Sequence, residues 1–134
     1  MQPKKSKHRK QFRGQMPGNS SRGQLVNFGE YGLKAVGRGW VAANQIEAAR
    51  KAMARHAQRG GKIWIRIFPD KPITKKALGT RMGSGKGDIF KYVAVVTPGR
   101  ILFEIAGVSR EVAELAFKRA GAKLPIDVRL VTKQ

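Results

Sequence analysis

The sequence contains no cysteine, only eight acidic residues and no apolar run long enough to cross a bilayer. Without cysteine there can be no disulfide, thiolate metal site or cysteine nucleophile. The acidic residues are scattered without paired or metal-ligand spacing, and the two histidines, His8 and His56, have no partner at motif spacing. We therefore expect no enzymatic activity, no metal and no other cofactor.

The N-terminus is rich in Lys and Arg but is not followed by the apolar stretch of a secretory signal. A basic N-terminus could also serve as a transit peptide. Among these alternatives, we expect the cytoplasm as the simplest location.

Positive charge is what the sequence has in excess. The chain of 134 residues has 28 Lys and Arg against 8 Asp and Glu, a formal net charge of +20. Self-repulsion of this size destabilises a compact chain unless a polyanion neutralises it. Nucleic acid is the usual polyanion, because each neutralised phosphate also releases counterions. Since 41% of the residues are hydrophobic, the chain can still bury a core. We therefore expect a folded nucleic-acid-binding protein.

The first 29 residues contain no acidic residue and few large apolar side chains, so alone they cannot bury enough surface to fold. We interpret residues 1–24 as an extended basic arm that orders on phosphates, and residues 25–134 as one folded domain. A solubilising tail is the alternative. The basic residues of the arm are Lys4, Lys5, Lys7, Arg9, Lys10, Arg13 and Arg22.

A helix is predicted over residues 44–60, where Asn44 can cap the N-terminus and Gly60 and Gly61 end the helix. Glu47 stands in the capping-box position. The predicted helix has two opposite faces. The apolar stripe consists of Ile46, Ala49, Met53 and Ala57, whereas Lys51, Arg55 and Arg59 lie opposite, with Arg50 at the flank. We interpret the cationic face as an RNA contact, and the alternative is the solvated face of an ordinary helix.

Strands are predicted on both sides of this helix. Alternation predicts strands at residues 31–36 and 62–68, and a hairpin of strands 89–97 and 100–106 joined by Pro98-Gly99. In the strand at 62–68, Trp64 and Phe68 share one face. These aromatic side chains either stack on nucleobases or pack against a helix or loop, and packing is the more common use.

A second helix is predicted after Ser109, its cap, and it ends at Gly121. We expect Val112, Leu115 and Ala116 to face the core. The last strand is predicted at residues 126–130. Together these elements predict an α+β fold, a two-layer sandwich in which two helices cover one face of a mainly antiparallel sheet.

Residues 69–88 lack periodicity, and a loop of this length is usually functional or disordered. Its glycines allow close backbone approach, and its basic residues outnumber its acidic ones. Gly85-Lys86 is not part of a P-loop, because Thr80 replaces the first glycine and Gly87 replaces the Ser/Thr that would hold magnesium. We therefore expect a cationic finger that contacts phosphates or inserts into RNA.

The chain resembles one family along nearly its whole length, the bacterial-type large-subunit ribosomal protein L-sixteen family. The matching segments are Pro3-Lys-Lys-Ser-Lys-His-Arg-Lys10, Phe28-Gly-Glu-Tyr-Gly-Leu-Lys-Ala35, Gly37-Arg-Gly39, Gln45-Ile-Glu-Ala-Ala-Arg50, Lys62-Ile-Trp-Ile-Arg-Ile-Phe-Pro-Asp-Lys-Pro-Ile-Thr74, Arg81-Met-Gly-Ser-Gly-Lys-Gly87 and Ala122-Lys-Leu-Pro125. The chain departs from the family at Ala42, where a threonine usually caps the first helix, at Ser84, often a lysine, and at Ala77-Leu78, a stretch that commonly contains proline.

The resemblance implies a structural protein of the large ribosomal subunit, bound to rRNA near the peptidyl-transferase region, that helps to position tRNA acceptor arms during translation. The implied partners are large-subunit rRNA, tRNA acceptor ends and neighbouring ribosomal proteins, with no membrane and no small-molecule substrate. The expected rRNA-binding residues are Lys4, Lys5, Lys7, Arg9, Lys10, Arg13, Arg22, Lys34, Arg38, Arg50, Lys51, Arg55, Arg59 and Arg66. The expected tRNA-facing residues are Lys75, Lys76, Arg81, Met82 and Lys86. Arg81 also matches an arginine that some bacteria hydroxylate.

Three other functions compete with this interpretation. A regulatory RNA-binding module outside the ribosome shares the charge argument. A cationic membrane-surface protein would use the helix at 44–60, but the apolar face of that helix is mostly alanine. A small RNA-modifying enzyme would need a substrate pocket that no motif indicates.

Overall fold

The computed structural model describes residues 2–4, 18–20, 22–57, 60–75 and 88–133. The side chains of residues 75 and 88–90 are not described. The elements in chain order are β1 (Tyr31–Ala35), β2 (Gly39–Ala42), α1 (Ala43–Ala57), β3 (Lys62–Ile65), β4 (Lys71–Lys75), β5 (Asp88–Val96), β6 (Ile101–Ala106), α2 (Arg110–Gly121) and β7 (Val128–Thr132).

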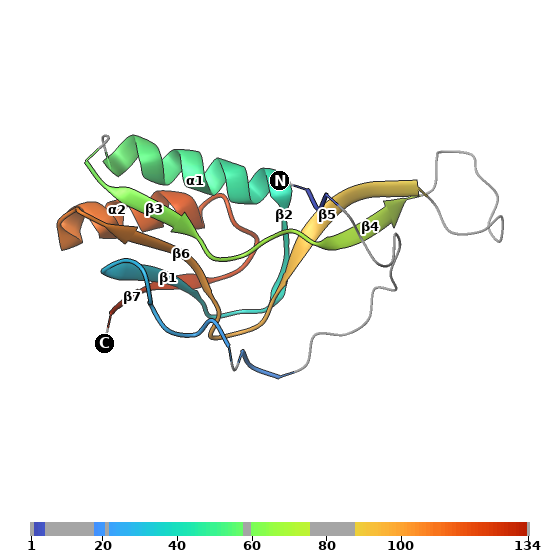
Figure 1. The fold of residues 1–134 in the computed structure, drawn as a ribbon, viewed down its shortest axis with the longest axis horizontal. Coiled ribbons are helices and arrows are strands. Elements are labelled where there is room, and N and C mark those ends of the chain that lie inside the picture. The colour runs from blue at the N-terminus through green and yellow to red at the C-terminus, as the bar shows by residue number, and fades with distance from the viewer. Residues whose placement is uncertain (1, 5–17, 21, 58–59, 76–87, 134) are drawn as a thin grey trace.

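The strands form two antiparallel sheets. Within the described ranges, one has four strands in the order β3-β6-β1-β7, and the other has three in the order β2-β5-β4. The helices α1 and α2 pack against each other and lie on the same side of the four-stranded sheet (Figure 1). The α+β sandwich with antiparallel strands and two helices on one face is therefore confirmed, with the strands divided between two sheets.

The helix α1 begins earlier than predicted. Its first residue is Ala43, so Asn44 lies inside the first turn and the prediction that it caps the helix is wrong. The strand β2, which the sequence analysis missed, ends at Ala42 directly before the helix. The side chain of Gln45 accepts a hydrogen bond from the Ala42 N–H at 2.8 Å, which is half of a capping box without the usual hydroxyl side chain. Glu47 instead contacts Arg50.

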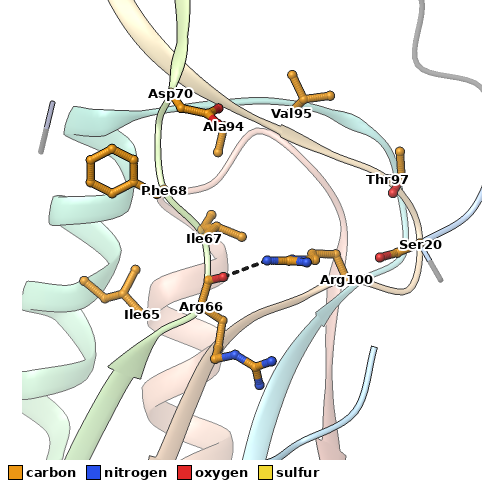
Figure 2. Close-up of a pocket in the computed structure, with 10 residues that line it drawn as sticks. All are labelled: Ser20, Ile65, Arg66, Ile67, Phe68, Asp70, Ala94, Val95, Thr97 and Arg100. Carbon is orange, nitrogen blue, oxygen red and sulfur yellow. Dashed lines mark hydrogen bonds between the residues drawn. The ribbon is translucent and has the colours of Figure 1, made fainter. Parts of the chain in front are cut away.

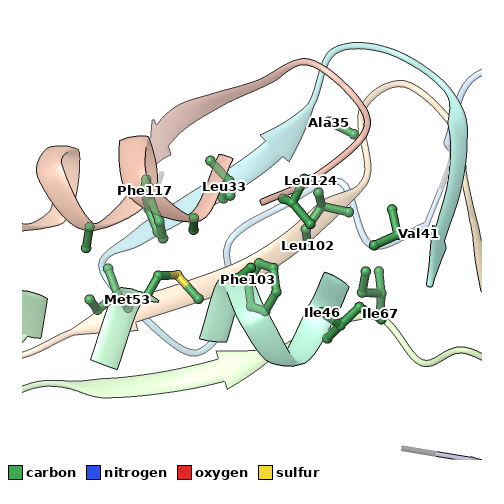
Figure 3. Close-up of a cluster of buried hydrophobic side chains, with 14 of the residues drawn as sticks. Leu33, Ala35, Val41, Ile46, Met53, Ile67, Leu102, Phe103, Phe117 and Leu124 are labelled. Atoms are coloured by element: carbon green, nitrogen blue, oxygen red, sulfur yellow. The ribbon is translucent and has the colours of Figure 1, made fainter. Parts of the chain in front are cut away.

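The core confirms the predicted apolar stripe of α1. Ile46, Ala49, Met53 and Ala57 are all buried, and Met53 lies near Phe103 of β6 (Figure 3). The cap of α2 is also confirmed, because the Ser109 hydroxyl accepts a hydrogen bond at 3.3 Å from the backbone N–H of Val112, three residues later.

The buried face of α2 differs from the prediction in one residue. Ala116 is buried and Val112 partly so, but Leu115 is 46% exposed, and its predicted place in the core is wrong. The core face instead consists of Ala113, Ala116, Phe117 and Ala120. The small alanines on this face let α2 approach α1 closely. The hydrophobicity of Leu115 alone therefore did not predict which face of α2 is buried.

The predicted strand 62–68 ends at Ile65, and a separate strand, β4, follows within the predicted loop 69–88. The strand contains Pro72, which cannot donate a ladder hydrogen bond. It is tolerated because β4 is at the edge of its sheet. The remainder of the predicted loop, residues 76–87, lies outside the described residues.

The Pro98-Gly99 turn is confirmed, but the predicted hairpin is wrong. The Arg100 N–H donates to the Thr97 carbonyl at 3.3 Å, and Gly99 has a φ of +97°, which glycine adopts without strain. However, β5 and β6 belong to different sheets. The Gly99 N–H donates to the Ala35 carbonyl at the end of β1, at 2.9 Å, so the turn carries the chain from one sheet to the other.

Candidate nucleic-acid interface

The structure describes eight of the predicted rRNA-binding side chains: Lys4, Arg22, Lys34, Arg38, Arg50, Lys51, Arg55 and Arg66. The other six predicted rRNA-binding residues lie outside the described residues: Lys5, Lys7, Arg9, Lys10, Arg13 and Arg59. The predicted tRNA-facing residues Lys76, Arg81, Met82 and Lys86 lie outside them as well. Lys75 ends β4, but its side chain is not described.

The solvent-facing side of α1 carries two kinds of cation. Arg50 forms an ion pair with Glu47 one turn earlier, and this hydrogen bond holds the pKa of the Glu47 carboxyl below its ordinary value. Lys51 and Arg55 are exposed and form no ion pair within the part of the chain that the structure describes. These two side chains are therefore available to an external anion.

A second group of cations lies on the four-stranded sheet. In the antiparallel pair of β1 and β7, Lys34 stands directly opposite Arg129. Like charges opposite each other in a sheet are destabilising, and neither residue has a salt bridge to the described acidic side chains. The adjacent residues Leu33 and Leu130 line the other face with Phe117 of α2. Lys34 and Arg129 therefore lie on the face away from the helices, which we call the outer face.

The outer face is hollowed beside this pair. An open groove of about 350 Å³ is lined by Lys34, Arg129 and Lys133, with uncharged residues from 24–27 and 131–132, and no acidic side chain lines it. We call it the cationic groove. The Lys133 ammonium donates a hydrogen bond to the Asn27 carbonyl at 3.3 Å, which fixes one wall.

Only Lys34 of this groove was predicted from the sequence. The alternation of the last strand places Arg129 on the side opposite the apolar face, so the exposure of Arg129 could be predicted from the sequence. The register that brings Arg129 to Lys34 joins residues nearly a hundred positions apart, and no local pattern encodes it.

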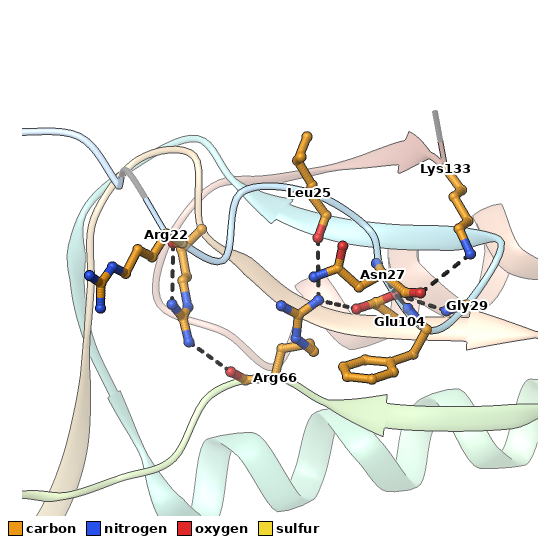
Figure 4. A network of polar contacts seen from close by, with 9 residues as sticks. Arg22, Leu25, Asn27, Gly29, Arg66, Glu104 and Lys133 are labelled. Atoms are coloured by element: carbon orange, nitrogen blue, oxygen red, sulfur yellow. Dashed lines mark hydrogen bonds and ion pairs between the residues drawn. The ribbon is translucent and has the colours of Figure 1, made fainter.

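Arg66 is neutralised within the fold. Its guanidinium forms an ion pair with Glu104 of β6, a carboxylate with 0% exposure, and the Arg66 side chain is only 14% exposed (Figure 4). The same carboxylate accepts hydrogen bonds from three successive backbone N–H groups, those of Asn27 at 3.0 Å, Phe28 at 2.7 Å and Gly29 at 2.8 Å. An rRNA contact by Arg66 stays a prediction. Within the fold, Arg66 neutralises the buried Glu104 carboxylate.

The electrostatics of Glu104 follow from these contacts. Burial alone would raise its pKa, but the hydrogen bonds from Gly29, Arg66 and Phe28 outweigh burial and hold the pKa below the ordinary value of 4.5. The carboxylate is therefore ionised at neutral pH. Glu104 was not among the predicted functional residues, although a single acid in an otherwise apolar strand was a visible signal.

The two aromatic residues of the predicted strand 62–68 have different surroundings. The Trp64 ring stacks on Phe28, with centroids 6.2 Å apart, so the packing alternative describes its contact. Phe68 is 48% exposed and lines an open cavity of about 620 Å³ (Figure 2). Arg100 lies across this cavity and donates to the Arg66 carbonyl at 3.0 Å. Base stacking by Phe68 stays a prediction.

The described residues contain neither a metal-binding cluster nor a membrane-spanning helix. No cluster of three or more His, Asp or Glu side chains there could hold a metal ion. No helix in the same ranges is both long and apolar enough to cross a membrane.

Comparison with known proteins agrees with the resemblance seen in the sequence. The family model described as ribosomal protein L16p/L10e matches residues 3–131. The chain is 57% identical over 132 residues to a protein named large ribosomal subunit protein uL16c from Adiantum capillus-veneris. The matched region covers 98% of this chain and 96% of the relative. The chain therefore belongs to the L16p/L10e family and is a ribosomal protein of the large subunit.

Proposed function

We propose that this large-subunit protein binds rRNA near the peptidyl-transferase region and helps to position tRNA acceptor arms during translation. The observation that carries the rRNA part is the facing pair of Lys34 and Arg129, two like charges held opposite each other without an ion pair to any acid that the structure describes. Such a pair is unfavourable in the free protein and becomes favourable when a phosphate lies between the two cations. The family resemblance supports the location on the ribosome.

The protein acts as a scaffold in this proposal. Arginine makes bidentate contacts with phosphate, and lysine acts as a point charge. The solvent-facing side of α1 belongs to the helical layer, and the cationic groove lies on the sheet. The protein can therefore join RNA segments on two sides. Recognition depends mainly on RNA shape and phosphate geometry, and the RNA itself performs the chemistry.

The tRNA part of the proposal rests on the residues that match the family's loop, Lys75, Lys76, Arg81, Met82 and Lys86. The positive charges of the lysines and of Arg81 near the incoming acceptor arm would attract its phosphates. Arg81 is also the proposed position of hydroxylation, and intact-mass measurement of the natural protein would detect the added oxygen.

The proposal also covers the cellular compartment. We propose a bacterial-type ribosome, in the cytoplasm of a bacterium or in an organelle. The Adiantum relative is a chloroplast homologue, which supports the organelle. Fractionation of the source cells, followed by detection of this chain, distinguishes the two.

Crosslinking tests the proposal directly. A photoreactive amino acid is introduced in place of Met82, and in a second variant in place of Leu115, an exposed residue of α2. Both variants are assembled into ribosomes that carry tRNA. We expect the probe at position 82 to crosslink the tRNA acceptor end and the probe at position 115 not to do so.

Two outcomes would contradict the proposal in different ways. If position 82 crosslinks rRNA alone, the tRNA role is wrong while the rRNA role stands. If the wild-type chain does not sediment with large subunits and instead binds a short isolated RNA tightly, a regulatory module outside the ribosome is the better description.

A further inference from the structure

Phe28 combines high exposure with a fixed position. The residue is 58% exposed, although its ring has two neighbours. The Trp64 ring lies 6.2 Å away at an interplanar angle of 21°, and the Arg66 guanidinium carbon lies 5.2 Å from the Phe28 ring centroid. Stacking and cation–π contacts of this geometry orient an aromatic ring. The ring is thus held on part of its surface and open on the rest.

The backbone beneath the ring is held as firmly. The Phe28 N–H donates to the buried Glu104 carboxylate at 2.7 Å, between two similar bonds from Asn27 and Gly29 (Figure 4). At Gly29 an added Cβ would come within 2.7 Å of the Ile105 carbonyl oxygen, so this backbone lies directly against β6. Because the backbone and the ring are both fixed before binding, a ligand that stacks on Phe28 pays little ordering entropy.

The charge around the ring is positive. The Lys62 ammonium lies 5.2 Å from the Trp64 ring centroid, and Lys62 is exposed. Glu104, whose carboxylate accepts a hydrogen bond from the Phe28 backbone, is fully buried and already paired with Arg66. The surface therefore offers a flat apolar ring beside a cation that has no ion pair among the described residues. A nucleotide has the complementary chemistry, a flat base next to a phosphate.

We propose that Phe28, supported by Trp64, is a stacking platform for an unpaired nucleobase of the large-subunit rRNA, with Lys62 contacting a neighbouring phosphate. This proposal rests on the proposed rRNA binding and adds base stacking to a surface otherwise described by its charges. It also assigns the stacking role to a residue that the alternation of strand 62–68 did not indicate.

The test is the affinity of the full-length protein for large-subunit rRNA. Phe28→Ala removes the ring, Phe28→Leu keeps the apolar character without a flat face, and Phe28→Tyr keeps the flat face. We expect Phe28→Ala and Phe28→Leu each to lower the affinity roughly five- to hundredfold, and Phe28→Tyr to retain it. The slope of affinity against salt should stay unchanged, because no phosphate contact is lost. Leu115→Ala, an exposed apolar change on α2, is the matched control and should bind like wild type.

Three outcomes would overturn the inference. Equal binding by all Phe28 variants would exclude a stacked base. Loss in Phe28→Ala that Phe28→Leu restores would show ordinary apolar packing. Unchanged rRNA affinity with weaker retention in assembled subunits would identify a protein neighbour as the occupant. Failure of the wild-type chain to bind rRNA would instead refute the proposed function, so the two failures are distinguishable. Thermal unfolding of each variant confirms that the fold is intact.

Discussion

The outer face of the four-stranded sheet uses its cations in two ways. On the β3–β6 side, Arg66 meets a buried glutamate that also binds three backbone N–H groups. On the β1–β7 side, Lys34 faces Arg129, and neither cation forms an ion pair with an acid among the described residues. The chain has 28 basic residues and only 8 acidic ones, so the placement of each acid is informative. Where an acid is buried with a cation, that cation belongs to the fold, and where none is present, the cations are left for an external anion.

The largest expected effect comes from breaking the Arg66–Glu104 side. Glu104→Gln should lower the free energy of unfolding at neutral pH by roughly 3–5 kcal/mol, because it leaves the Arg66 charge buried without its partner. The pH dependence follows from the lowered pKa. Since folding lowers the pKa of Glu104, its ionised form stabilises the fold fully above the ordinary value of 4.5, and this stabilisation is lost as the pH falls through the folded-state pKa.

Denaturant unfolding of wild type and Glu104→Gln between pH 7 and pH 3 measures both effects. The difference between the two proteins should be greatest at neutral pH and should shrink in acid. A constant difference across this range would mean that the hydrogen-bond geometry, and not the charge, makes Glu104 important.

The second effect comes from the β1–β7 side. The double variant Lys34→Gln and Arg129→Gln should weaken rRNA binding about tenfold and reduce the slope of log affinity against log salt by about two. Stability should change in the opposite direction and rise slightly, because the like-charge repulsion is removed. Filter binding at several salt concentrations and thermal unfolding together measure this. If the variant loses stability and keeps its affinity, the pair is structural and the contrast between the two sides disappears.

The smallest effect is expected from the cations of the helices, where exposed cations of α1 are compared with exposed cations of α2. Lys51→Gln with Arg55→Gln on α1 should weaken rRNA binding severalfold, because these exposed cations have no ion pair among the described residues. The matched control on α2, Lys118→Gln with Arg119→Gln, removes the same charge from an exposed surface and should have less effect. Equal losses in the two variants would show that only net charge matters and that α1 is not an RNA-facing surface.

The sequence predicted those features that depend on local spacing. The apolar stripe of α1 and the Ser109 cap were both correct, because each depends on residues three or four positions apart. The hairpin at Pro98-Gly99 was wrong because the turn residues are local, whereas the choice of β1 as the partner of β6 is not. For the same reason Lys34 was predicted as a site residue without Arg129. The role of Glu104 depends on backbone N–H groups, which carry no side-chain signal in the sequence.

The hydrogen bonds of Glu104 also constrain the order of events during synthesis. The carboxylate lies 75 to 77 positions after the backbone groups that it binds. When a ribosome makes this chain, the segment Asn27–Gly29 emerges long before the residue that fastens it, and contacts of such separation form late in folding. Phe28 therefore reaches its final position only after β6 has been made, so the last quarter of the chain completes a surface that the first quarter supplies.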